Sequence, residues 1–143
     1  MMIGLDAIKL AGSSLGECGL LGKVRDGHEL LNLLFSPQGR EFCQSNSFPT
    51  LSLIRSVAKD LDTRALVDKG EVIIDEPESL VLVGRTDAVV RCSDPTCLRH
   101  IILMHGAKLT LETRRYSVVT LTAIGDGCSF EVVNDGTACV EIE

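Results

Sequence analysis

The second half of the chain repeats a pair of short apolar segments about every 20 residues, and this repeat limits the folds open to it. The first members of the pairs are Val72-Ile73-Ile74, Ala88-Val89-Val90, Leu109-Thr110-Leu111 and Phe130-Glu131-Val132. They are separated by 16, 21 and 21 residues. The second members begin at residues 80, 101, 119 and 138, which are 21, 18 and 19 residues apart. A period near 20 residues, built from strand-like segments, is typical of a solenoid.

Most of these segments alternate apolar and polar residues and are bounded by glycine, aspartate or asparagine, as β-strands between tight turns are. The expected strands are residues 71–75, 79–83, 87–92, 100–105, 107–113, 116–123, 128–134 and 137–143. Along 116–123, we expect Val119, Leu121 and Ala123 to face an interior. The alternate residues, Val118, Thr120 and Thr122, are expected to face outward. One strand pair cannot bury its own apolar edge, whereas stacked pairs share a continuous interior.

We therefore predict an α+β fold, in which short helices precede a small β-solenoid of about four two-strand rungs. An antiparallel β-sandwich of the same strands is the alternative, because strand spacing alone fits both folds. The similarity between residues 84–90 and 106–111, at equivalent joints of the repeat, favours the solenoid. The expected regions are a helical capping or interaction region over 1–66 and a β-solenoid domain over 67–143.

The first half carries start signals for several short helices. Asp26 is suited to cap a helix, with Glu29 three residues later as its capping-box partner. Ser36 before Pro37 is a second start signal, and a third lies at residues 47–50. Helices this short are marginal in isolation, so we expect them to pack on one another and to cap one end of the solenoid.

Composition narrows the range of functions. Aromatic residues make up 3% of the chain, which fits a narrow aliphatic interior. The same shortage disfavours surfaces that bind sugars or single-stranded nucleic acid by stacking on aromatic rings. The net charge is −6, and all of this excess lies in residues 67–143. A nucleic-acid partner is therefore not expected, because phosphate neutralisation needs lysine and arginine.

The sequence lacks the expected marks of export and of membrane insertion. Its first residues do not combine a basic segment with a long apolar run, and nowhere do about 18 apolar residues follow one another. We expect a cytoplasmic protein that does not contact a membrane. The cysteines are even in number, but in that compartment they are expected to be reduced thiols. They are Cys18, Cys43, Cys92, Cys97, Cys128 and Cys139.

One cluster has the residue types of a metal site. Cys92, Cys97, His100 and His105 form a C-x4-C-x2-H-x4-H pattern. Thiolates and imidazoles are the ligands of structural zinc, and four of them would complete a tetrahedral site. The alternative is a loop between rungs that contains one buried cysteine. No cofactor is expected apart from this candidate zinc ion.

Two partial motifs do not make a catalytic site. Residues 12–16 match G-x-S-x-G, but a nucleophile elbow needs a preceding strand and none is expected there. Residues 28–32 begin with His-Glu but lack the second histidine of a zinc protease. Asp126-Gly127 and the segment 134–136 are expected to form turns rather than calcium loops. We expect no enzymatic activity and name no catalytic residue.

In general layout, the second half resembles the short β-helical modules of fibre, tail and cytoskeletal scaffold proteins. The terminal strand of such a stack leaves backbone groups unpaired, and solenoids need their ends covered. We therefore expect a non-catalytic structural or protein-interaction protein that self-associates through a solenoid end. A small-molecule-binding or zinc-binding regulatory module is the alternative.

Overall fold

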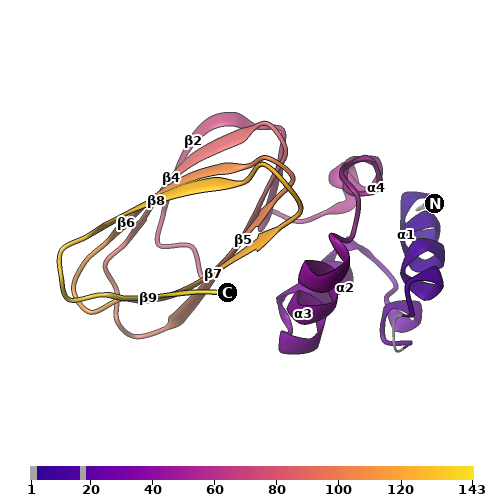
Figure 1. The fold of residues 1–143 in the computed structure, drawn as a ribbon, viewed down its shortest axis with the longest axis horizontal. Helices are drawn as coiled ribbons and strands as arrows, with labels where there is room; N and C mark the ends of the chain where they lie inside the picture. Colours follow the sequence, from indigo (N-terminus) through magenta and orange to yellow (C-terminus); the bar gives the residue numbers. More distant parts are fainter. Residues whose placement is uncertain (1–2, 17–18) are drawn as a thin grey trace. The chain divides into compact units, whose positions relative to one another are not determined.

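The structure is a computed structural model that describes residues 3–16 and 19–143. The chain divides into two compact units, Met1–Ala65 and Leu66–Glu143. The first unit is helical, and the second is built from parallel strands that coil into a β-solenoid (Figure 1). Among the described residues, no helix combines the length and the apolar character needed to cross a membrane.

The helical unit consists of short elements whose starts follow the sequence signals. They are α1 (Ile3–Ser14), the 3-10 helix η1 (Leu21–Lys23), α2 (Gly27–Phe35), α3 (Pro37–Asn46), α4 (Leu51–Ser56) and the 3-10 helix η2 (Ala58–Asp60). Asp26 caps α2 by accepting a hydrogen bond from the Glu29 amide at 2.9 Å. Ser36 caps α3 in the same way, and Thr50 caps α4. The expected capping box differs in one detail, because the Glu29 carboxylate accepts from the Arg25 amide rather than from Asp26.

A polar network fixes the end of the helical unit onto α2. The Arg64 guanidinium donates to Asp62 at 2.7 Å, to the Asn32 side-chain oxygen at 2.7 Å and to the His28 carbonyl at 3.0 Å. His28 Nδ1 lies 2.9 Å from the Asp62 carboxylate. The paired guanidinium holds the pKa of Asp62 well below its usual range. His28, in the first turn of α2, therefore bonds to Asp62 across the unit.

The second unit contains all eight expected strands and one more that was not expected. The strands are β1 (Ala65–Val67), β2 (Gly70–Asp75), β3 (Ser79–Val83), β4 (Thr86–Cys92), β5 (Leu98–Met104), β6 (Lys108–Thr113), β7 (Val118–Ile124), β8 (Ser129–Asn134) and β9 (Cys139–Ile142). They form two sheets, in the orders β1-β3-β5-β7-β9 and β2-β4-β6-β8. The chain alternates between the two sheets and completes about three turns from β2 to β8. Each strand pairs with the strand one turn earlier in the chain. The solenoid is confirmed, and the parallel pairing is not that of the antiparallel sandwich.

The expected register is correct in the four-stranded sheet and partly correct in the five-stranded sheet, where Leu80 pairs with Ile101 as the repeat predicts but the later steps differ. In the four-stranded sheet, Val72 pairs with Ala88, Ala88 with Leu109 and Leu109 with Phe130, as the repeat predicts. In the five-stranded sheet, the alignment places Val119 beside Ile101, but the structure pairs Ile101 with Leu121. The next step is also displaced by two residues, because Val119 pairs with Val140. A slip of two residues keeps every side chain on its own face, so alternation cannot detect it.

The solenoid interior is aliphatic, as the shortage of aromatic residues predicts. Val119 and Leu121 face this interior as expected, whereas the expected outward residues Thr120 and Thr122 are also buried. Thr122 donates a 2.7 Å hydrogen bond to the Glu143 carboxylate. The buried cluster consists of Leu80, Leu82, Ala88, Val90, Cys92, Ile101, Leu103, Ala107, Leu109, Leu111, Val119 and Leu121.

One corner of the solenoid has the same left-handed backbone conformation in successive coils. Gly84, His105 and Gly125 directly follow β3, β5 and β7, and their φ angles are 65°, 51° and 80°. The Gly84 amide donates to the Met104 carbonyl, and the His105 amide donates to the Ile124 carbonyl, each at 3.0 Å. Glycine adopts this left-handed conformation readily, whereas histidine does so at a cost. His105 therefore occupies a turn position that the neighbouring coils fill with glycine.

Candidate functional site

The four residues of the expected zinc site do not converge. Cys92 is buried at the end of β4, and this burial raises the pKa of its thiol to about 11. His100 lies within β5, in register with Thr120, and His105 belongs to the turn after β5. Across residues 3–16 and 19–143, no three His, Cys, Asp or Glu side chains are grouped so that they could hold a metal ion. The zinc site stays a prediction that this geometry does not support.

An ion pair, rather than a metal, holds the loop between Cys92 and Cys97. Arg99, 2% exposed, pairs with Glu76 at 2.8 Å and donates to the Pro77 carbonyl at 2.9 Å. Glu76 also accepts hydrogen bonds from the amide and the hydroxyl of Ser93, both at 2.7 Å. This arrangement supports the alternative interpretation, in which the segment is a loop between rungs with one buried cysteine.

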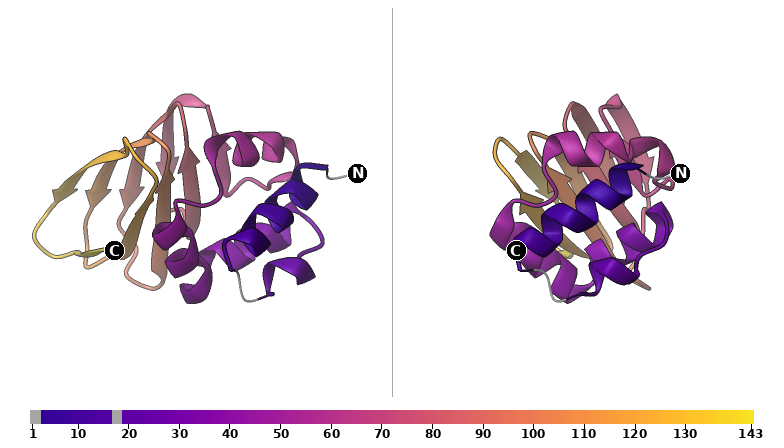
Figure 2. Two further views of the ribbon diagram at one scale, coloured as in Figure 1. Left: turned by 45° about the vertical axis from the view of Figure 1, so that its right-hand side comes forward. Right: turned by 90° about the vertical axis from the view of Figure 1, so that its right-hand side faces the viewer.

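The terminal coil, which we define as β8 and β9, presents two strand edges. Within the described part of the chain, β8 pairs only with β6 and β9 pairs only with β7. Figure 2 shows the strands following one another along the solenoid, with the yellow terminal coil at the end of the series. Parallel strands direct amide and carbonyl groups to both sides, so the outer sides of β8 and β9 carry groups available to another strand.

The same coil opens the aliphatic interior to solvent. Phe130 pairs in register with Leu109, and its exposed fraction is 39%, against 3% for Leu109. Ile142 pairs with Leu121 and is 55% exposed, whereas Leu121 is fully buried. Val132 of β8 is partly buried and packs against the buried cluster. Side chains that fill the interior in the middle coils therefore form an apolar surface at the terminal coil.

Acidic residues and a polar turn border this surface. Glu131 on β8 and Glu141 on β9 are exposed, and each pairs in register with a threonine of the preceding coil. Between the strands, the Asp135 carboxylate accepts hydrogen bonds from the amide and the hydroxyl of Thr137, at 2.9 and 2.7 Å. Hydrogen bonding to Thr137 lowers the pKa of Asp135. The expected turn at 134–136 is confirmed, because Gly136 has a φ of 95°.

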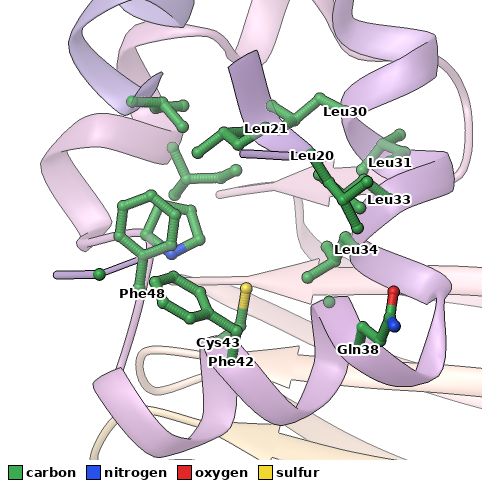
Figure 3. A pocket seen from close by; sticks show the side chains of 15 residues that line it. Leu20, Leu21, Leu30, Leu31, Leu33, Leu34, Gln38, Phe42, Cys43 and Phe48 are labelled. Carbon is green, nitrogen blue, oxygen red and sulfur yellow. The ribbon is translucent and has the colours of Figure 1, made fainter. Parts of the chain in front are cut away.

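A second candidate site, which the sequence did not reveal, is a partly open cavity of about 170 Å³ in the helical unit. Figure 3 shows leucine side chains of α2 on one side of it and the rings of Phe42 and Phe48 on the other. Cys43 and Gln38 also line the cavity, and the Gln38 amide lies at the edge of the labelled group. The lining residues in the described part of the chain are Ile8, Gly16, Leu20, Leu21, Leu30, Leu31, Leu33, Leu34, Gln38, Gly39, Phe42, Cys43, Phe48, Pro49 and Ile54.

No family model, curated protein or solved structure matches this chain.

Proposed function

We propose that this chain is a non-catalytic interaction module that self-associates through the terminal coil of its solenoid. The observation that carries the proposal is the exposure of Phe130 and Ile142, whose register partners Leu109 and Leu121 lie in the buried interior. Hydrophobic surface and unpaired strand edges coincide there, and together they favour association with another β-structure.

A second copy of the same coil is the occupant that fits this surface. Its terminal coil has the same spacing between the two sheets and the same aliphatic interior. The strand edges and the interior of one copy can therefore align with those of the other at the same time. Two copies related by a two-fold axis form a closed, self-complementary contact, in which facing strands run antiparallel. If two β8 strands pair about Val132, Glu131 of one copy lies opposite Val133 of the other, and no two carboxylates are directly opposed.

The acidic border gives the contact a characteristic response to salt. Glu131 and Glu141 bring like charges from both copies to the same end of the solenoid. Dissolved salt screens exposed charges, so self-association is expected to strengthen as the salt concentration rises. A contact held mainly by opposite charges would weaken instead.

The test compares two lysine substitutions by sedimentation velocity. Ile142→Lys places a charge on the terminal coil, whereas Ile73→Lys places one at a similarly exposed isoleucine of β2, which is 61% exposed. The unaltered chain and Ile73→Lys are expected to form dimers, and Ile142→Lys is expected to sediment as a monomer. The proposal fails if the unaltered chain is a monomer at high concentration. It also fails if Ile142→Lys dimerises as well as its control.

A further inference from the structure

We propose that the cavity of the helical unit is a binding site for a small, neutral, monocyclic aromatic molecule. Its volume is about 170 Å³, and almost every lining side chain is aliphatic or aromatic. Apolar cavities of roughly 150 Å³ with such linings stay dry and take up molecules of the size of benzene. This site lies within one unit and is independent of the terminal coil.

The lining excludes charged ligands. Among the described residues that line the cavity, there is no aspartate, glutamate, lysine, arginine or histidine. The polar side-chain groups there are the Cys43 thiol and the Gln38 amide, and neither carries a charge, because burial raises the pKa of Cys43 to about 12. An ionised ligand would lose its hydration without gaining a counter-charge.

The walls favour a flat ring over a flexible chain. Phe42 and Phe48 pack edge to face, with ring centroids 5.6 Å apart and an interplanar angle of 75°. A third ring beside this pair can extend the same edge-to-face arrangement. The Cys43 sulfur adds a polarisable contact of the kind that favours aromatic partners. A rigid ring also loses less conformational entropy on binding than an alkyl chain of equal volume.

The experiment uses the full chain and two probes of the same ring size, toluene and benzoate. Toluene at about ten times its dissociation constant is expected to raise Tm by about 3 °C, because a ligand that binds only the folded state stabilises it. Benzoate at the same concentration is expected to leave Tm unchanged. Intermolecular NOEs from the toluene methyl group to the rings of Phe42 and Phe48 would place the ligand in the cavity.

A pair of matched cysteine variants tests the location. Cys43→Leu fills part of the cavity and is expected to abolish the toluene shift, whereas Cys97→Leu, in a loop of the solenoid unit, is expected to retain it. If Cys43→Leu fails to fold, the NOEs to Phe42 and Phe48 decide the question in the unaltered chain. Equal shifts with toluene and benzoate would overturn the proposal, as would the absence of NOEs. Ile142→Lys is expected to bind toluene unchanged, so failure of one proposal does not carry over to the other.

Discussion

Two identical substitutions in one interior column test the solenoid and its open end together. Ile74, Val90, Leu111 and Val132 follow one another in register along the four-stranded sheet. Val90 is fully buried, whereas Val132 is only partly buried because no coil follows it in the described structure. Shortening either valine to alanine removes two carbon atoms from the same column, so the difference between the variants reflects burial.

The magnitudes follow from that difference. Each buried methylene contributes about 0.8 kcal/mol, so Val90→Ala loses about 1.6 kcal/mol of transfer free energy. The cavity left behind brings the expected loss of unfolding free energy to about 2–3 kcal/mol. Val132→Ala forfeits only part of the transfer term and leaves no enclosed cavity, so we expect a loss of about 1 kcal/mol.

The assay is urea unfolding, at concentrations where the protein is monomeric. Tyr116 is the only tyrosine and the chain has no tryptophan. It lies between β6 and β7, so its fluorescence reports on the solenoid and can be compared with far-UV circular dichroism of the whole chain. Equal losses for Val90→Ala and Val132→Ala would refute the assignment of β8 to the open end. A smaller loss for Val90→Ala than for Val132→Ala would refute the register itself.

Three further predictions concern the titration of a carboxylate, the reactivity of thiols and the fit of a glycine. The folded pKa of Asp62 is lowered by its guanidinium partner, so its stabilising effect is present above pH 4 and lost as the pH falls through the folded pKa. Thermal melts of Asp62→Asn should therefore show that the free energy of unfolding falls by about 1 kcal/mol or less at pH 7. The stability of this variant should also decrease less than that of the unaltered chain as the pH falls below 4, and an equal decrease in both would contradict the prediction. In native alkylation followed by mass spectrometry, exposed Cys139 should react well before Cys43, which is buried and has a pKa raised to about 12; equal rates would be incompatible with this core. A Cβ at Gly39 would overlap a backbone carbonyl of α2, so Gly39→Ala should cost about 1–3 kcal/mol in chemical denaturation. Gly22→Ala, which meets no atom within 4 Å, should change stability by less than about 0.5 kcal/mol, and similar costs for both would show that the contact is absent.

The helix starts were predictable because their signals are local. A side-chain oxygen caps a helix by accepting a hydrogen bond from an amide two or three residues later in the chain. Asp26, Ser36 and Thr50 all do this. β1 was not expected, because three residues are too few to show an alternating pattern. Its pairing depends on the neighbouring strand rather than on its own sequence.

The two candidate sites differ in how far the sequence reveals them. A solenoid prediction already implies strand edges at the ends, so the terminal coil could be anticipated from the repeat alone. The cavity could not, because it depends on how leucines from α2 and phenylalanines near α3 and α4 leave space between them. The zinc site suggested by the C-x4-C-x2-H-x4-H pattern stays a prediction, because spacing along the chain says little about side chains that face different sides of a coil.

The apolar repeat predicted the four-stranded register, and a column of charged residues agrees with it. Arg91 lies in register between Asp75 and Glu112, and its side chain approaches their carboxylates at 3.8 and 3.4 Å. A slip of two residues would separate these charges. β7 and β9 carry no comparable landmark, since apolar residues alternate with Thr120 and Thr122 in β7 and fit equally well after such a slip.

The corrected register changes what the terminal coil presents. With Ala138 beside Val119, as the repeat alone suggests, Val140 would pair with Leu121, and Ile142 would pair with Ala123. The observed pairing instead places Ile142 on Leu121, in the column that passes through Ile101 and Leu80. The apolar interior therefore continues to the last strand and ends in a large side chain open to solvent. Ile142 is exposed because no described strand pairs with the outer side of β9, so Ile142→Lys tests whether the open end of this column drives self-association.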